Sequence, residues 1–245
     1  MAKRGCTMQV DGKVCLITGA SKGIGRAVAL ALAAKGARLL LVARGEAALE
    51  ATSQECRDAG SPRVVSLVED VGDLKGLDAI VMTAVREFDG FDVLVNNAGG
   101  GAVKPIEEVT DEEFDRAVAV NLRAPFMLTQ AAVKTLRRRG GGQVINIGSG
   151  LSYFGRAGWS LYAATKFGLR GMTESVRHEV AKQGIKVCLV APGYTETHFF
   201  DDFEEPVSFD GALQPEDIAH AVLAVIEQPA TSDIKEVTVR GPKSP

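Results

Sequence analysis

Short apolar runs alternate with longer helix-like segments along this chain of 245 residues, and this alternation limits its fold more than any other feature. One run, Arg38–Val42, is almost entirely apolar, as expected of a parallel strand that is buried on both faces. Strands are expected at Val14–Thr18, Arg38–Val42, Arg63–Leu67, Asp92–Val95, Gln143–Ile147, Lys186–Ala191 and Glu236–Arg240. Because helix-like segments separate these seven strands, the pattern predicts an α/β fold, a doubly wound parallel sheet with helices on both faces.

The helix-like segments have recognisable ends. They are expected at about 24–35, around Ala47–Ala51, at Leu74–Phe88, at about Asp111–Arg138, at Leu161–Lys182 and at Pro215–Ile226. Thr110 is expected to cap the fourth of them, and Pro125 is expected to kink it. No Pro/Ser-rich linker or repeat interrupts the pattern, so residues 1–245 are expected to form a single domain with a tail at about 1–10.

Charge and composition exclude several classes of partner. The formal charge of −3 gives no general attraction to nucleic acid or to an anionic membrane. No stretch reaches the ~18 apolar residues of a membrane span, and the first residues lack the apolar run of a secretory signal. The four cysteines form no C-x-x-C pair, and Cys15 and Cys188 lie in strand-like runs, as expected in a reducing compartment. A cytoplasmic protein is therefore expected.

A glycine-rich turn lies directly between the first expected strand and the first expected helix. Gly19 suits a tight turn, Gly23 lets the backbone approach a pyrophosphate, and Gly25 permits close packing of the helix on the strand. The free N–H groups of the helix would face the anion. The residues expected to bind a dinucleotide here are Gly19, Ser21, Lys22, Gly23, Ile24 and Gly25. Their spacing, G-x-x-x-G-x-G, departs from the general G-x-G-x-x-G pattern.

Motifs spread along nearly the whole chain resemble those of the short-chain dehydrogenase/reductase family. They are Thr18-Gly19-x-x-x-Gly23-x-Gly25, Asp70-Val71, Asn96-Asn97-Ala98-Gly99, Asn121, Ser149, Tyr162-x-x-x-Lys166, and Pro192-Gly193 with Thr197, in the order that the family shows them. The resemblance implies a Rossmann fold, a nicotinamide cofactor and hydride transfer between a carbonyl and an alcohol. It is broadest with the reductases of 3-oxoacyl groups that are bound to a carrier protein.

The residues after the second expected strand favour NADP(H) over NAD(H). NAD-selective sites present an acid to the ribose 2′-hydroxyl about twenty residues past the glycines. Here Arg44 follows the strand, and no acid precedes Glu46. Arg44 can hold a 2′-phosphate through two hydrogen bonds, and Lys22 adds a second cation. The alternative is that both cations are solvated surface residues.

The resemblance implies further contacts with the cofactor. Asp70 would bind the adenine amino group, and Val71 would line the adenine pocket. Backbone that passes close to the cofactor would come from Asn97, Ala98 and Gly99. The nicotinamide carboxamide would be flanked by Pro192, Gly193 and Thr195 and bound by Thr197.

Tyr162 and Lys166 lie four residues apart in a helical pattern, so both project from one helix face. The ordinary pKa of a tyrosine is about 10, and a nearby ammonium favours the phenolate and lowers that pKa. Tyr162 is therefore expected to be the general acid/base, with Lys166 tuning it and, by resemblance, holding the nicotinamide ribose. By resemblance, Ser149 would orient the substrate oxygen, and Asn121 would hold a water that links Lys166 to solvent.

Residues 194–213 are expected to form a substrate lid, because this irregular segment is rich in Phe and acidic residues. Closure would exclude water from hydride transfer. The alternative, a solvated loop anchored by two Phe residues, stays open. Trp159, Tyr153 and Phe154 are expected to wall the other side of the pocket, and His198 lies where it could touch the substrate. The three histidines lack metal-ligand spacing, so no metal site is expected.

The predicted function is that of an NADP(H)-dependent oxidoreductase that interconverts a small-molecule ketone or aldehyde and an alcohol. Two alternatives stay open: a reductase specific for 3-oxoacyl chains on a carrier protein, and a cofactor-binding sensor of the same fold without turnover. Met127 and His178 stand where carrier-binding basic residues would be expected, which weakens the first alternative. By resemblance, the helices at about Asp111–Arg138 and Leu161–Lys182 would pack against a second subunit in a homodimer or homotetramer.

Overall fold

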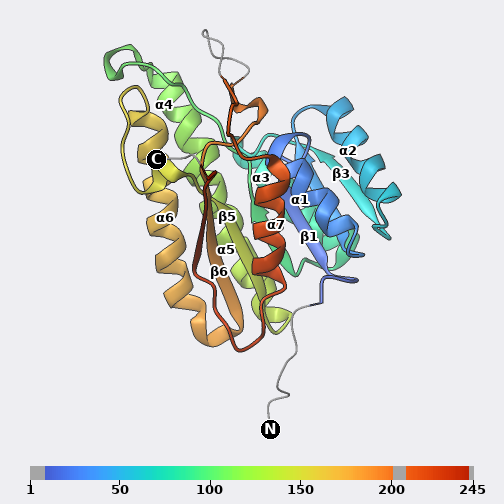
Figure 1. Ribbon diagram of the computed structural model, residues 1–245. Helices are drawn as coiled ribbons and strands as arrows, with labels where there is room; N and C mark the ends of the chain where they lie inside the picture. The colour runs from blue at the N-terminus through green and yellow to red at the C-terminus, as the bar shows by residue number, and fades with distance from the viewer. Residues whose placement is uncertain (1–8, 201–207, 243–245) are drawn as a thin grey trace.

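One parallel sheet forms the centre of the computed structural model, which describes residues 9–200 and 208–242 (Figure 1). Its strands are β1 (Val14–Thr18), β2 (Arg38–Ala43), β3 (Val64–Val68), β4 (Val93–Asn96), β5 (Gly142–Ile147), β6 (Ile185–Pro192) and β7 (Glu236–Val239). They lie in the order β3-β2-β1-β4-β5-β6-β7, and every neighbouring pair is parallel. The predicted doubly wound sheet is confirmed, and its strand order reverses between β1 and β4, where ligands bind in such folds.

Two layers of helices cover the sheet. One face carries α1 (Gly23–Ala33), α2 (Glu46–Asp58) and α7 (Pro215–Ile226), and the other carries α3 (Leu74–Phe88), α5 (Ala124–Arg138) and α6 (Ser160–Val180). Side chains alternate between the two layers along each strand. In β1, Cys15 and Ile17 join the first layer, whereas Val14 and Leu16 join the second. The apolar runs in the sequence therefore bury both of their faces, as predicted.

The long helix predicted at about Asp111–Arg138 is interrupted before Pro125. Helix α4 (Asp111–Val118) ends in a π-helical turn, η2 (Ala119–Arg123), and α5 follows directly. Pro125 occupies the first turn of α5, where its missing N–H breaks no bond within the helix. The interruption of the helix near Pro125 is therefore the π turn just before that residue. Thr110 caps α4 as predicted, because its Oγ1 accepts from the backbone N–H of Glu113 at 3.2 Å.

A ladder of polar side chains crosses the otherwise apolar layer under α5 and α6. Asn96 of β4 is the register partner of Asn146 of β5, and its Nδ2 donates to Asn146 Oδ1 at 2.8 Å and to Thr129 Oγ1 at 3.2 Å. Asn146 Nδ2 donates in turn to Thr173 Oγ1 at 2.8 Å. Asn96 and Asn146 are both buried, so the ladder ties two central strands to α5 and α6 inside the core.

The cysteines that the structure describes lie inside the protein. Cys15, Cys56 and Cys188 are buried free thiols, and burial raises the pKa of each, to about 12 for Cys56 and Cys188. Cys6 falls outside the described residues, as do residues 1–8 of the expected tail and 201–207 of the expected lid. Within the described ranges, no cluster of His, Cys, Asp and Glu could hold a metal ion. None of the helices that the structure describes is long and apolar enough to cross a membrane.

Candidate active site

The glycine turn between β1 and α1 packs tightly against the end of β4. Gly19 has a positive φ of 65°, and a Cβ there would lie 2.9 Å from Ala98 Cα. A Cβ on Gly25 would lie 2.2 Å from the Gly19 carbonyl oxygen, so α1 can approach this closely only without a side chain. Asn97 locks the contact, because its Nδ2 donates to the carbonyl oxygens of Thr18 at 2.9 Å and Gly19 at 3.0 Å.

The N-terminus of α1 offers backbone N–H groups to an anion. Gly23 starts the helix with a φ of 56°, and no side chain accepts a capping hydrogen bond at the N-cap residue Lys22. The first N–H groups of the helix point outward from such an end. Ile24 packs on the core, and the Ser21 carbonyl accepts from Thr52 Oγ1 at 3.3 Å, which ties the turn to α2. This is a cradle of the kind that a pyrophosphate fits.

Two cations lie near the end of β2. Arg44 and Lys22 are exposed, and Arg44 is close enough to Asp70 that its charge lowers the pKa of that carboxyl. Glu46 already belongs to the first turn of α2, one residue beyond the N-cap Gly45. The group that follows β2 in this chain is therefore a guanidinium, which suits a phosphate on the adenine ribose.

Asp70 is held by a residue that the sequence did not indicate. Arg116 of α4 donates from Nη2 to Oδ1 at 3.0 Å and lies 2.9 Å from Oδ2, while the N–H of Gly72 donates to Oδ1 at 2.7 Å. Burial acts to raise the pKa of Asp70, but these two contacts outweigh it and hold the pKa below its ordinary value. Asp70 is therefore fixed as an anion beside Val71. No motif could have indicated Arg116, because 46 residues separate the pair.

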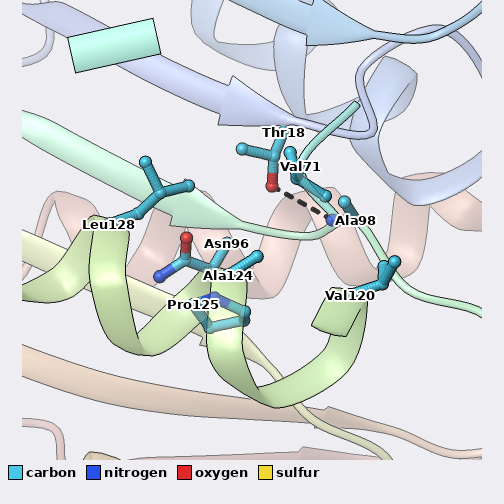
Figure 2. Close-up of a pocket in the computed structure, with 8 residues that line it drawn as sticks. All are labelled: Thr18, Val71, Asn96, Ala98, Val120, Ala124, Pro125 and Leu128. Atoms are coloured by element: carbon cyan, nitrogen blue, oxygen red, sulfur yellow. Dashed lines mark hydrogen bonds between the residues drawn. The ribbon is translucent and has the colours of Figure 1, made fainter. Parts of the chain in front are cut away.

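Val71 borders a small hollow between the ends of β1 and β4 and the start of α5 (Figure 2). The lining residues are Thr18, Val71, Asn96, Ala98, Val120, Ala124, Pro125 and Leu128. Thr18 Oγ1 accepts from the N–H groups of Asn97 and Ala98, both at 3.1 Å, and Figure 2 draws the second bond. The hollow is too narrow for a water molecule, so it is a packing gap beneath the Asn97–Gly99 backbone.

Ser149 and Tyr162 meet at the carboxyl end of β5. Ser149 caps a 3₁₀ turn, η3 (Gly150–Ser152), because its Oγ accepts from the N–H of Leu151 at 3.1 Å. The same hydroxyl hydrogen-bonds Tyr162 and acts to lower its pKa. Ser152 is fully buried, and its Oγ accepts from the N–H of Ser149 at 3.2 Å. The serine beside the tyrosine is therefore Ser149, the one that the resemblance implied.

Lys166 lies one helical turn after Tyr162 in α6 and is almost entirely buried. Its Nζ donates to the carbonyl oxygen of Ile147 at 2.9 Å and lies 5.5 Å from the centre of the Tyr162 ring. Burial lowers the pKa of Lys166 to about 8. A Cβ on Gly99 would lie 3.6 Å from this Nζ, so the backbone that follows β4 runs past the ammonium group. The two residues share one side of α6, as their spacing predicted.

The expected lowering of the Tyr162 pKa is not found in this structure. Burial is the larger influence and raises the pKa to about 12, while the hydrogen bond from Ser149 offsets only part of that rise. The Lys166 ammonium donates to the Ile147 carbonyl oxygen. In this structure Tyr162 is therefore a protonated phenol, ready to donate a proton.

Asn121 lies in the π turn η2, fully buried, and joins two parts of the site. Its Oδ1 accepts from the N–H of Gly100 at 3.0 Å, and its Nδ2 donates to the Gly100 carbonyl oxygen at 2.6 Å and to Thr165 Oγ1 at 3.1 Å. The helical segment is thus interrupted by a π turn at Asn121. Asn121 connects the segment after β4 to the residue that precedes Lys166.

The segment after β6 returns across the edge of the sheet. The N–H of Gly193 donates to the Val239 carbonyl oxygen at 2.7 Å, so Pro192 and Gly193 stay attached to β7. Thr195 is buried and forms a β-bridge with Leu213, which closes the base of residues 194–213. Thr197 lies against the glycine turn, because its Cβ would be 3.6 Å from a Cβ on Gly23. Thr197, which was expected to bind the nicotinamide, therefore lies next to the glycine turn that was expected to bind the pyrophosphate.

Two of the described aromatic rings pack against the ring of the candidate acid, Tyr162. The Tyr162 ring lies 5.8 Å from Trp159 and 5.2 Å from Phe199, both edge to face, and Trp159 and Phe199 stack 6.0 Å apart. Trp159 thus lies where it was expected. The expectation for Tyr153 is wrong, because its hydroxyl bonds Glu236 and its ring lies under Arg170. Phe154 packs over Gly150 and is half exposed, and His198 is exposed.

A Rossmann sheet with a glycine cradle, and a Ser–Tyr–Lys group at the same edge, defines a dinucleotide-dependent oxidoreductase. The chain belongs to the short-chain dehydrogenase/reductase family, whose sequence profile, described as short chain dehydrogenase, matches residues 13–207. It is 37% identical over 190 residues to the 3-oxoacyl-[acyl-carrier-protein] reductases FabG of Vibrio cholerae and Escherichia coli, which covers 78% of this chain and 76% of theirs. An uncharacterized oxidoreductase of Staphylococcus aureus is 31% identical over 93% of this chain and 96% of its own.

Solved structures agree with this family. A metagenomic short-chain oxidoreductase in complex with NADP is 34% identical and superposes with a TM-score of 0.83 over 94% of this chain and 98% of its own. The L-sorbose reductase of Gluconobacter frateurii, complexed with NADPH and L-sorbose, is 28% identical with a TM-score of 0.86 over 96% and 98% of the two chains. The relatives therefore match nearly the whole described fold.

Proposed function

We propose that this enzyme interconverts a small ketone or aldehyde and an alcohol, with Tyr162 as the general acid/base. The enzyme is an NADP-dependent dehydrogenase/reductase that acts on CH–OH groups. The observation that carries the proposal is the placement of Tyr162, whose ring centre lies 5.5 Å from the Lys166 Nζ one helical turn away and whose hydroxyl interacts with Ser149. Arg44 and Lys22 would hold the 2′-phosphate, and the start of α1 would hold the pyrophosphate. Thr197, Pro192, Gly193 and Thr195 would contact the nicotinamide end.

When bound, NADPH supplies a hydride to the carbonyl carbon. In reduction, a C–H and an O–H bond form, the C=O π bond breaks, and the products are the alcohol and NADP⁺. Ser149 orients the carbonyl oxygen, and Tyr162 gives its proton to the developing alkoxide. Lys166 favours the resulting phenolate by its charge, and Asn121 steadies the segment that lies beside it. Asp70 and Val71 would contact the adenine, and the backbone of Asn97, Ala98 and Gly99 would pass close to the cofactor.

The substrate in this proposal is a small carbonyl compound. A second candidate, a 3-oxoacyl chain on a carrier protein, is supported by the 37% identity to FabG proteins. However, the exposed residues Met127 of α5 and His178 of α6 offer no fixed positive charge to an acidic carrier. A carbonyl panel that includes 3-oxoacyl thioesters with and without a carrier protein, followed as NADPH oxidation, separates the two candidates. The buried reduced thiols support a cytoplasmic location.

Tyr162→Phe tests the proposed mechanism. The variant removes the ionisable hydroxyl but keeps the ring contacts with Trp159 and Phe199, so the fold and NADPH affinity should persist. Because the proton donor acts mainly in the transition state, kcat should fall by at least about 100-fold. NADPH oxidation and NADPH binding by fluorescence check the two expectations. Near-normal turnover with intact binding would remove Tyr162 from the mechanism.

A further inference from the structure

We infer that the pocket of this enzyme selects carbonyl compounds bearing an aromatic ring, through stacking on Trp159 and Phe199, over polyhydroxylated ones. The inference rests on the proposed function, since it names the substrate class of the same site. It begins from three mutually contacting rings, those of Tyr162, Trp159 and Phe199.

The two selecting rings come from different elements of the fold. Trp159 is the N-cap residue of α6, three residues before Tyr162, and Phe199 lies in the short 3₁₀ turn η5 (His198–Phe200) after β6. Their planes are within 13° of parallel, and both meet the Tyr162 ring edge to face. A substrate whose carbonyl oxygen reaches Tyr162 and Ser149 must place its substituents next to these rings. A flat aromatic substituent there can pair with Trp159 or Phe199, stacked or edge to face.

Backbone also runs past the Tyr162 ring, because a Cβ on Gly101 would lie 3.5 Å from Tyr162 Cδ2, an ordinary van der Waals contact. Among the described residues, Trp159 and Phe199 are the aromatic side chains that a substituent placed beside Tyr162 would meet. Hydroxyl groups placed against these ring faces would lose their hydrogen bonds to water without replacement, which disfavours a sugar-like substrate.

The chain contains one tryptophan, so Trp159 reports binding at this place and nowhere else. In the enzyme–NADP⁺ complex, acetophenone should quench Trp159 fluorescence and bind more tightly than cyclohexyl methyl ketone, which has similar size but no π face. L-sorbose should bind more weakly than both. Phe199→Leu keeps the reporter, and it should weaken acetophenone binding by about threefold to tenfold, the range for one lost aromatic pair. Cyclohexyl methyl ketone should bind that variant nearly as it binds the wild type.

Turnover gives the second readout. The ratio of kcat/KM for acetophenone to that for cyclohexyl methyl ketone should fall in both Trp159→Leu and Phe199→Leu. Phe114→Leu, which changes a half-exposed ring on α4, is the matched control and should keep the wild-type ratio. A wild-type ratio near one, or equal losses for both ketones in the two variants, would overturn the inference.

The two readouts separate failure of the inference from failure of the proposed function. If both ketones are reduced but neither binding nor turnover prefers acetophenone, the function stands and the aromatic selection is wrong. If acetophenone binds selectively at Trp159 but no carbonyl compound supports NADPH oxidation, the selection stands and the proposed reaction is wrong. Absence of both quenching and turnover contradicts both.

Discussion

Arg44 at the end of β2 is the residue whose charge distinguishes NADP(H) from NAD(H). Arg44→Asp replaces a phosphate-binding guanidinium with a carboxylate that repels phosphate and can accept a hydrogen bond from a ribose hydroxyl. The ratio of kcat/KM for NADPH to that for NADH should fall by at least about tenfold, the low end for a lost charged hydrogen bond. Steady-state kinetics with both cofactors measure the ratio.

A charge reversal elsewhere controls for a general electrostatic effect. Arg57→Asp makes the same change in α2, where Arg57 pairs with Glu50 on the surface, and it should leave the cofactor ratio unchanged. If Arg44→Asp also leaves it unchanged, the 2′-phosphate is bound elsewhere.

Lys166 should impose a pH limit on carbonyl reduction. Its pKa is lowered to about 8 by burial, so the ammonium beside Tyr162 is lost as the pH rises through that value. The kcat/KM for reduction should therefore decline above about pH 8, because a neutral amine cannot stabilise the phenolate. In Lys166→Arg the side chain keeps its charge well above this pH, because a guanidinium is not deprotonated in proteins, and this decline should disappear from the pH–rate profile.

Lys186→Arg is the matched control. Lys186 also has a pKa lowered by burial and donates to a backbone carbonyl, that of Pro229 at 2.9 Å, but it lies at the opposite end of β6. Its variant should keep the wild-type profile. A decline near pH 8 that survives in Lys166→Arg would assign the ionisation to another group.

At the scale of secondary-structure elements, the contact between α1 and β1 depends on a missing side chain. Gly25→Ala would place a Cβ 2.2 Å from the Gly19 carbonyl oxygen, so the turn must shift. The variant should lose about 1–3 kcal/mol of folding stability, as overpacked cores do, and should bind NADPH more weakly. Thermal unfolding and NADPH titration measure the two effects.

Gly171→Ala makes the same substitution in α6, where a Cβ would meet no atom within 4 Å. It should instead stabilise the protein by about 0.5–1 kcal/mol, because alanine favours a helix interior. Equal effects of the two substitutions would show that the close approach at Gly25 has no energetic importance.

The elements that the sequence predicted well are those whose signals are local. The alternation of strands and helices, the Thr110 cap and the turn at Gly19–Gly25 all depend on residues within a few positions of one another. The contacts that it missed join distant elements: Arg116 reaches Asp70 from α4, and Tyr153 bonds Glu236 across 83 residues. Such pairs depend on how distant elements pack against one another, and the spacing of residues along the sequence does not reveal that packing.

On the scale of the whole molecule, large apolar side chains remain exposed on neighbouring helices. Phe126 and Met127 of α5 and Phe167 of α6 are 51%, 39% and 43% exposed. We expect these faces to be covered by a second copy of the chain in a homodimer or homotetramer. Light scattering at micromolar concentration should give a multiple of the chain mass, and Phe126→Glu with Phe167→Glu should yield a monomer. A monomeric wild type would contradict the expectation.

The amide ladder between β4 and β5 has a consequence for how the sheet assembles. Apart from Gly142 and Gln143, the other buried positions of both strands are aliphatic, and strands buried on both faces have no polar face that would distinguish one alignment from another. Displacing β5 along β4 would part Asn96 from Asn146 and leave buried amides unpaired, at about 1–3 kcal/mol for each. Alternative registers of β4 and β5 are thus destabilised during folding. The native register is favoured because it alone pairs the two buried amides.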